Sequence, residues 1–252
     1  MSSDIQKKLP EGFNLQAFLS LDSTNKEAAR RIADGASTGL WITAGEQLSG
    51  RGRGDREWVS QPGNLYASLI YETQGDIYGA AQLSFVTALA VRDTVFEFLQ
   101  LQDIKCKWPN DILVDGRKIS GILLESSTAL GTGKNYMIIG IGINITHHPD
   151  VALYEATHIN EQTGQEFCQA DVFVKLAEKM AYWLSLWEER GFDPIRESWL
   201  SNARGLGEQI TVRLPNEQLI GRFVDLDRGG ALKLEVDDEI KLIHSGDVFF
   251  TS

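Results

Sequence analysis

The strongest local signal in this sequence is a hairpin, carried by the segment Lys105-Cys106-Lys107-Trp108-Pro109-Asn110-Asp111-Ile112-Leu113-Val114-Asp115-Gly116-Arg117-Lys118-Ile119-Ser120-Gly121. An Asp-Gly pair between two apolar runs predicts a type I′ turn. With Asp115 and Gly116 as the loop, the expected register pairs Val114 with Arg117, Leu113 with Lys118 and Asp111 with Ser120. Because side chains alternate along a strand, Asp111 and Lys118 share a face as diagonal neighbours, roughly 7 to 8 Å apart at Cα. An acid and a base on an otherwise apolar hairpin favour a functional site over a surface salt bridge, which contributes about 0 to 1 kcal/mol when exposed.

A second unusual stretch lies upstream, directly after a predicted strand over residues 40–44. It reads Gln47-Leu48-Ser49-Gly50-Arg51-Gly52-Arg53-Gly54-Asp55-Arg56-Glu57-Trp58. Glycines allow a backbone to approach a ligand closely, and arginines match the geometry of phosphate and carboxylate groups. The stretch is neither a Walker P-loop nor a GxGxxG dinucleotide motif. Its composition alone leaves two interpretations equally open: an anion-binding loop, or a mobile loop with solvated charges.

Two further stretches carry weaker signals. Residues 138–145 predict an apolar strand with Ile139, Ile141, Ile143 and Ile145 on one face and Gly140, Gly142 and Asn144 on the other. Glycines in mid-strand indicate that a ligand or a large aromatic side chain packs against the backbone there. Ser23-Thr24-Asn25 is followed by Lys26 and Glu27, and an N-cap residue three places before a Glu predicts a capping box for a helix through Ile32. Taken alone, both stretches have ordinary structural explanations.

Composition limits the class of protein. The chain has 252 residues, 42% of them hydrophobic, and 24 basic against 35 acidic residues give a net charge of −11. This is typical of a folded soluble protein, and a surface so acidic disfavours broad non-specific DNA binding. No apolar run approaches the roughly 20 residues needed to cross a membrane, and the start of the chain lacks the apolar core of a signal peptide. We therefore expect a cytoplasmic protein.

The metal-binding and nucleophilic residue types offer little at this level. Cys106 and Cys168 are too few for a disulfide framework or a zinc site, and Cys106 is expected to be buried. The four histidines have no HxxxH or triad-like spacing, so the sequence gives no support to a histidine metal site or to Ser-His-Asp catalysis.

Hydrophobic periodicity outlines the remaining elements. Residues 65–71 predict a strand, and residues 80–100 predict a core helix with Phe85, Leu89, Phe96 and Leu99 on its buried face. A second helical stripe consists of Leu176, Met180, Trp183, Leu184 and Trp187, which is typical of core packing rather than ligand binding. Helices mixed with strands predict an α/β or α+β fold in a first domain over residues 1–205.

The pattern changes after Gly205-Leu206-Gly207. Short alternating segments follow, such as Ile210/Val212/Leu214 and Leu232/Leu234/Val236, separated by Pro215-Asn216 and Gly229-Gly230. These predict a small β-barrel-like domain over residues 206–252, and its length of about 45 residues is near the limit for independent folding. We expect it to dock on the larger domain.

These stretches occur together in one order that closely resembles the biotin protein ligases, over nearly the whole chain from about Phe13. The order is STN, then QxxGRGRxxRxW, then KWPND with the lysine of Arg117-Lys118-Ile119, then GxGxN. The resemblance implies an α+β fold, a mixed sheet with flanking helices, which is the class II synthetase-like catalytic fold of biotin and lipoate ligases. It also implies an SH3-like C-terminal barrel that helps to bind ATP and the acceptor. One departure is Asp55, where the family usually has a glycine, so the loop is expected to be slightly less positive and less flexible.

The resemblance implies a two-step ligase reaction. Biotin carboxylate attacks the α-phosphorus of Mg-ATP to give biotinyl-5′-AMP, and a lysine of the biotin carboxyl carrier domain of acetyl-CoA carboxylase then attacks this intermediate. Two anions must meet, so cations have to neutralise them, and Lys118, Arg51 and Arg53 are the expected catalytic residues. A loop closed over the mixed anhydride would also exclude water.

The same resemblance assigns the binding residues by their match to the family's motifs. Biotin is expected at Ser23, Thr24, Asn25, Gln47, Gly50, Arg51, Gly52, Arg53, Lys118, Gly121, Gly140 and Gly142. ATP and the adenylate are expected at Arg53, Arg56, Trp58, Asn110, Asp111, Lys118 and Asn144, with Asp111 as a candidate ligand for Mg²⁺.

Alternatives and partners complete the expectations. A lipoate or octanoate ligase of the same fold is disfavoured because its RRxSGGGxVxHD-like segment is missing, and a non-catalytic biotin sensor is disfavoured because Arg51, Arg53 and Lys118 are retained. Only 22 residues precede Ser23, too few for a winged helix-turn-helix domain, so no repressor role is expected, and no nucleic acid or membrane partner. A homodimer stays open.

Overall fold

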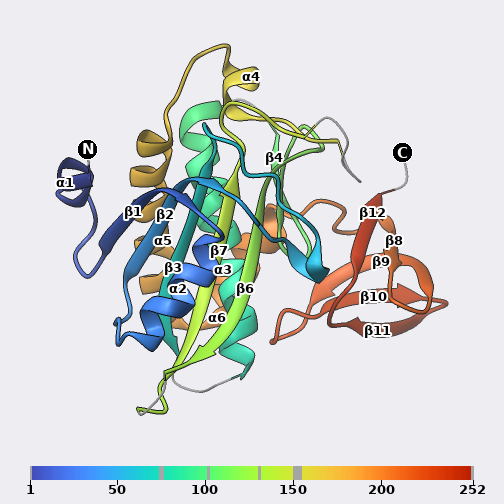
Figure 1. Ribbon diagram of the computed structural model, residues 1–252. Helices are drawn as coiled ribbons and strands as arrows, with labels where there is room; N and C mark the ends of the chain where they lie inside the picture. Colours follow the sequence, from blue (N-terminus) through green and yellow to red (C-terminus); the bar gives the residue numbers. More distant parts are fainter. Residues whose placement is uncertain (1, 74–76, 101–102, 130–131, 150–154, 251–252) are drawn as a thin grey trace.

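A computed structural model describes residues 2–73, 77–100, 103–129, 132–149 and 155–250 (Figure 1). Its larger part is built on a seven-stranded sheet with the strand order β1-β2-β3-β7-β6-β5-β4. The strands are β1 (Asn14–Leu21), β2 (Leu40–Gln47), β3 (Leu65–Thr73), β4 (Ile104–Lys107), β5 (Asp111–Val114), β6 (Arg117–Thr128) and β7 (Asn135–Ile143). The β1–β2 pair is parallel and the other pairs are antiparallel, so the predicted mixed sheet is confirmed.

Alternating strand residues face two helical layers. Trp41, Leu69 and Ile139 pack into the main core, and their neighbours Ile42, Ile70 and Ile138 form a smaller cluster on the opposite face. Figure 1 shows the long helices on one side of the sheet and α2 on the other. The helices are α1 (Ser2–Gln6), α2 (Thr24–Ala33), α3 (Ile77–Leu99), α4 (Ile159–Thr163), α5 (Gln169–Arg190) and α6 (Phe192–Ser201). None of those described is long and apolar enough to cross a lipid bilayer.

The helix predictions hold with two corrections. The stripe on α5 is buried or partly buried in the core, as predicted, and so are Phe85, Leu89 and Leu99 on α3. Phe96 was wrongly placed in the core: it is 42% exposed, and the Arg92 guanidinium lies 5.3 Å from its ring centre. The capping box is also wrong, because Ser23 is the N-cap without a side-chain cap bond, and Glu27 instead pairs with Arg30 and Arg31.

The hairpin forms with the expected turn but with a shifted register. Asp115 and Gly116 have φ values of 49° and 79°, which the type I′ turn requires. The pairs Val114–Arg117 and Leu113–Lys118 are confirmed, but the predicted pair Asp111–Ser120 is wrong. A β-bulge adds a residue on β6, so Ile112 lies opposite Ser120 and Asp111 lies opposite Gly121. The bulge leaves Asp111 and Lys118 in contact.

The C-terminal part is a five-stranded antiparallel sheet with the order β11-β10-β9-β8-β12. Its strands are β8 (Gln209–Arg213), β9 (Gln218–Leu226), β10 (Leu232–Val236), β11 (Glu239–Ile243) and β12 (Asp247–Phe250). The expected docking is present: Trp108 Nε1 donates a buried hydrogen bond of 3.1 Å to the Gly230 carbonyl, and Trp199 contacts Phe223. One hydrophobic cluster therefore spans both parts, and the division at residue 205 stays a prediction.

Candidate functional site

A cavity of about 300 Å³ lies where the start of α2, the glycine-arginine loop, the hairpin and the C-terminal sheet meet. Every residue that the sequence assigned to the site lines this cavity, except one. The exception is Gly50, which is buried beneath the loop. A Cβ at Gly50 would lie 2.4 Å from both Ser60 Oγ and the Trp58 carbonyl oxygen, so this glycine is required for the packing of the loop.

One end of the cavity is a network of hydroxyl and amide groups at the start of α2. The Thr24 backbone N–H donates to Gln47 Oε1 at 2.8 Å, and Asn25 Nδ2 donates to Glu125 Oε2 at 2.7 Å. Beneath them, the fully buried Ser68 hydroxyl lies 2.6 Å from Asn25 Oδ1 and 2.7 Å from Thr24 Oγ1. The network holds donors and acceptors in fixed positions, which suits a small polar group of a ligand.

The glycines on β7 allow two side chains to lie flat against the sheet. A Cβ at Gly140 would lie 2.4 Å from Asn25 Oδ1, and a Cβ at Gly142 would lie 2.5 Å from Trp58 Cε2. The question left open by the strand pattern is thereby answered in part: a large aromatic side chain, Trp58, packs on the glycine face. Trp58 Nε1 is buried without a hydrogen-bond partner among the described residues, which leaves a donor available to a ligand.

The expected cations line the same cavity, and each is held by a carboxylate; Arg51 shares Glu125 with Asn25 of the network. Lys118 Nζ lies 2.6 Å from Asp111 Oδ1, Arg51 Nη2 lies 2.9 Å from Glu125 Oε1, and Arg53 Nη2 lies 2.7 Å from Asp247 Oδ1. The loop itself contains a short 3₁₀ turn, η1 (Arg53–Asp55). The side chain of Asp55, the one departure from the family motif, lies outside the described residues.

The carboxylate of Asp247 forms ion pairs with both Arg53 and Arg56, and so joins the loop to β12. Burial alone would raise the pKa of Asp247, but the hydrogen bond and charge of Arg56 and the charge of Arg53 bring it below its usual value. The carboxylate is therefore ionised at neutral pH and occupies the arginines that an anionic ligand would need.

The amide side chains of the site also hold the backbone around it. Asn110 Nδ2 donates to the Ile122 carbonyl at 2.6 Å, and Asn144 Nδ2 donates to the Thr157 carbonyl at 3.0 Å. Asp111, the candidate metal ligand, would have to share its carboxylate between a cation and Lys118.

Several site residues were missed by sequence reasoning. Lys107 lines the cavity and is only 5% exposed, and burial lowers its pKa to about 8, an effect that the charge of Asp111 opposes. Lys107 lies within the KWPND motif and could have been found there. Ser68, Glu125 and Asp247 stand in ordinary strand sequence, and no local pattern marks them.

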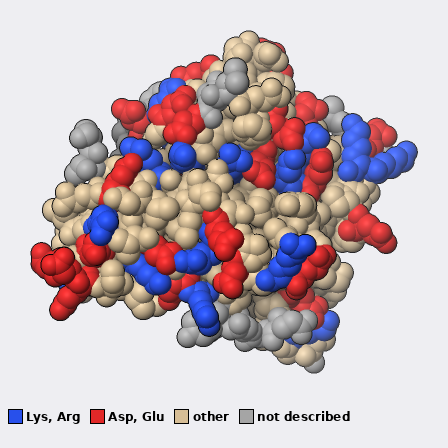
Figure 2. All heavy atoms as spheres, turned by 180° about the vertical axis from the view of Figure 1, so that it is seen from behind, with Lys and Arg blue, Asp and Glu red and all other residues tan. Residues whose placement is uncertain are grey.

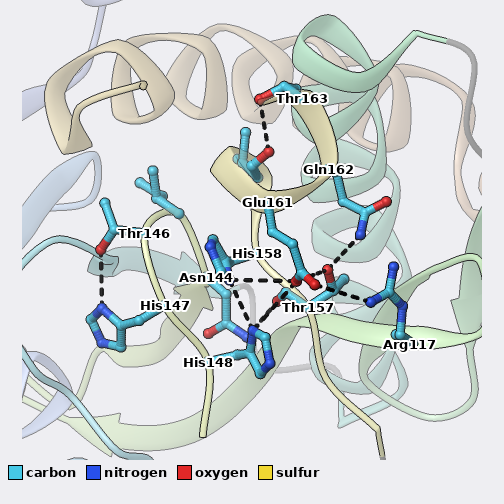
Figure 3. A network of polar contacts seen from close by, with 12 residues as sticks. Arg117, Asn144, Thr146, His147, His148, Thr157, His158, Glu161, Gln162 and Thr163 are labelled. Carbon is cyan, nitrogen blue, oxygen red and sulfur yellow. Dashed lines mark hydrogen bonds and ion pairs between the residues drawn. The ribbon is translucent and has the colours of Figure 1, made fainter. Parts of the chain in front are cut away.

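Two of the histidines meet in the structure, which their spacing along the chain does not predict. Spacing along the chain gave no metal arrangement, yet His148 and His158 meet with their Nδ1 atoms 2.8 Å apart, beside Glu161 (Figure 3). Ten residues separate the two histidines, so only the fold brings them together. Cys106, in contrast, is fully buried as predicted, and burial raises the pKa of its thiol to about 12.

Comparisons with known proteins agree with this geometry. The biotin/lipoate A/B protein ligase family model matches residues 17–144, and the biotin protein ligase C-terminal domain model matches residues 205–251. A biotin--[acetyl-CoA-carboxylase] ligase of Paracoccus denitrificans is 39% identical over 235 residues, which cover 91% of this chain and 97% of the relative.

Two solved structures have the same fold. The biotin protein ligase of Aquifex aeolicus in complex with biotin and ATP superposes with a TM-score of 0.80 at 30% identity, covering 94% of this chain and 97% of the other. The biotin protein ligase of Leishmania major in complex with biotinyl-5-AMP superposes with a TM-score of 0.67 at 27% identity, covering 94% of this chain and 100% of the other.

Proposed function

Because this chain belongs to the biotin protein ligase family, and is thus a ligase enzyme, we propose that it attaches biotin to a specific lysine of the biotin carboxyl carrier domain of acetyl-CoA carboxylase. The reaction uses ATP and passes through biotinyl-5′-AMP. The observation that carries the proposal is the convergence of Arg51, Arg53 and Lys118 on one cavity that also contains a fixed network of hydroxyl and amide groups.

The polar network and the cations suit the two polar groups of biotin. The ureido group of biotin carries a carbonyl acceptor and two N–H donors, and the network of Thr24, Asn25 and Ser68 offers both kinds of partner. The glycines of β6 and β7 let Trp58 lie flat on the sheet, and its ring offers an apolar face to the rings of biotin. The carboxylate of biotin then points toward the cations.

In the first step, a biotin carboxylate oxygen attacks the α-phosphorus of ATP, the new acyl–phosphate bond forms, and pyrophosphate leaves. Arg51, Arg53 and Lys118 neutralise the carboxylate and the phosphate oxygens as these anions approach one another. Ion pairs with Glu125, Asp247 and Asp111 hold the three cations beside the cavity. When the substrates bind, their anionic groups replace these carboxylates as partners of the cations.

In the second step, the neutral ε-amine of the acceptor lysine attacks the acyl carbon of biotinyl-5′-AMP, an amide bond forms, and AMP leaves. The same cations stabilise the departing phosphate. Mg²⁺ would enter with ATP and supply further charge neutralisation, and Asp111 is the carboxylate that fits it in the cavity wall.

The proposal places the enzyme in the cytoplasm and gives it no repressor role, because a net charge of −11 opposes phosphate backbones. A homodimer is compatible with the proposal, and light scattering of the purified chain would measure the oligomeric state. A gel-shift assay, with biotin-pathway operator DNA from a repressor ligase as the probe, would test the absence of DNA binding.

Biotin-dependent ATP–pyrophosphate exchange on the purified protein with Mg²⁺ tests the central proposal, with lipoate and octanoate in parallel. Exchange with biotin alone would support adenylation of biotin. Exchange with lipoate or octanoate instead would assign the chain to the related ligases of the same fold. Binding of biotin without exchange would leave a non-catalytic sensor.

A further inference from the structure

His148, His158 and Glu161 form a compact group beside the cavity. His148 lies in the segment that follows β7, His158 immediately precedes α4, and Glu161 lies in α4. Figure 3 shows the two imidazole rings facing one another, with the Glu161 side chain directed toward them. The proposed ligase reaction uses none of the three residues.

The three donor atoms lie close to the separations that a coordinated ion requires. The two Nδ1 atoms are 2.8 Å apart, and Glu161 Oε2 lies 3.7 Å from His148 Nδ1 and 3.6 Å from His158 Nδ1. The circle through three atoms at these separations has a radius of about 2.0 Å, so an ion at the usual zinc–ligand distance from all three would lie in their plane. A tetrahedral site needs the two Nδ1 atoms to move to about 3.3 Å from one another, which small rotations of the imidazole side chains supply without rearrangement of the backbone.

The donor types select the class of ion. Imidazole nitrogens suit zinc and other late first-row transition metals, whereas Mg²⁺ prefers an all-oxygen shell. Two Nδ1 atoms that face each other also need something between them, either a shared proton or a cation, because their lone pairs repel. All three side chains are partly exposed, so a hydrated ion can reach them and keep water as a further ligand.

The carboxylate is already oriented by its neighbours. The Thr157 hydroxyl donates to Glu161 Oε2 at 2.8 Å, and Arg117 Nη1 donates to Glu161 Oε1 at 3.3 Å. Such outer contacts fix ligand orientation in metal sites and commonly change metal affinity 10- to 100-fold.

We propose that His148, His158 and Glu161 bind one divalent transition-metal ion of the zinc class. The ion links the segment after β7 to α4. The residue directly before His158 is Thr157, whose carbonyl accepts a hydrogen bond from Asn144 of the cavity wall, so the metal stabilises that wall from outside. Its role is structural and separate from the Mg²⁺ that accompanies ATP.

The test is a titration of the metal-free protein with Co²⁺ and with Zn²⁺. We expect one Co²⁺ per chain with a visible d–d absorption band, which Zn²⁺ displaces, and excess Zn²⁺ should raise the unfolding temperature by about 5 °C. Replacing both imidazoles, in His148→Ala/His158→Ala, should abolish the band and the stabilisation. Glu161→Gln keeps the shape of the side chain and should weaken Zn²⁺ binding by about tenfold or more.

His147→Ala is the matched control. His147 directly precedes His148 but contacts Asn64 and Thr146 instead, so this variant should bind Co²⁺ as the wild type does. The proposal is overturned if wild-type protein gives no d–d band, or if the double variant and the wild type bind Co²⁺ equally. Should the double variant fail to fold, unchanged Zn²⁺ affinity in Glu161→Gln would overturn it as well. Pyrophosphate exchange is not the readout, so the outcome is independent of the proposed reaction.

Discussion

Lys118 is the cation that both the hairpin pattern and the cavity single out. Its amine lies 2.6 Å from Asp111 and 5.4 Å from the centre of the Trp58 ring, so its position is fixed from two sides. A pre-positioned charge needs little reorganisation when an anion arrives, and such groups commonly contribute 10²- to 10³-fold to a rate.

Lys118→Ala should therefore reduce biotin-dependent ATP–pyrophosphate exchange by about 10²-fold or more, because the charge on the reacting carboxylate and phosphate is left unbalanced. Calorimetry should still detect biotin binding. Lys134→Ala removes an exposed lysine that pairs with Glu72 far along the sheet, and it should leave exchange unchanged. Full exchange activity in Lys118→Ala would contradict the assigned role.

Lys107 gives a pH dependence of stability. Burial lowers its pKa from 10.5 to about 8, so the unfolded chain binds more protons at this residue between pH 8 and 10.5. The lysine's contribution to the free energy of unfolding must then rise with pH across this window, by up to about 3 kcal/mol. Urea unfolding of wild type and Lys107→Met between pH 7 and 10 should show a steeper rise for the wild type; parallel curves would contradict the lowered pKa.

At the scale of elements, the glycines of β7 allow side chains from α2 and from the end of the glycine-arginine loop to pack closely against this strand. A methyl group on Gly142 would collide with Trp58, which in turn contacts β6 near Gly121. The side chains of Trp58 and Asn25 therefore pack directly against the backbone of β7.

Gly142→Ala should destabilise the protein by about 1 to 3 kcal/mol, because it overpacks this contact. The same substitution made in a Trp58→Ala background should cost at least about 1 kcal/mol less, since the ring that it meets is gone. Urea unfolding of the four proteins measures this coupling, and additive effects would show that Trp58 is not the group that collides.

At the scale of the whole molecule, the face seen from behind carries charged side chains of both signs, and neither sign covers it alone. Figure 2 shows basic and acidic side chains interspersed there. Besides the shared hydrophobic cluster, ion pairs join the two parts, including Arg196 with Asp225 and the loop arginines with Asp247.

Asp247→Asn should release the glycine-arginine loop from β12. A loss of about 1 kcal/mol raises the population of the open loop about fivefold, and trypsin cleavage within residues 51–56 should accelerate accordingly. Asp225→Asn breaks another contact between the two parts but leaves the loop alone, so its cleavage rate should match the wild type. Mass spectrometry of the early fragments distinguishes the two results.

Sequence alone determined much of this protein. Turn chemistry at Asp115-Gly116, the periodicity of α3 and α5, and the motif order were sufficient for the hairpin, the main helices, the family and more than half of the residues that line the cavity. The hairpin and the helices are local features, because backbone conformation and side-chain period depend on near neighbours. The family and the cavity residues followed from motifs that match those of known ligases.

Tertiary structure decided the rest. The bulge that moved Asp111 opposite Gly121, the burial of Ser68 beneath Asn25, the reach of Asp247 to Arg53 and the meeting of His148 with His158 depend on packing between distant segments. Sheet register and domain docking arise from the summed burial of many side chains, which no short window of sequence contains.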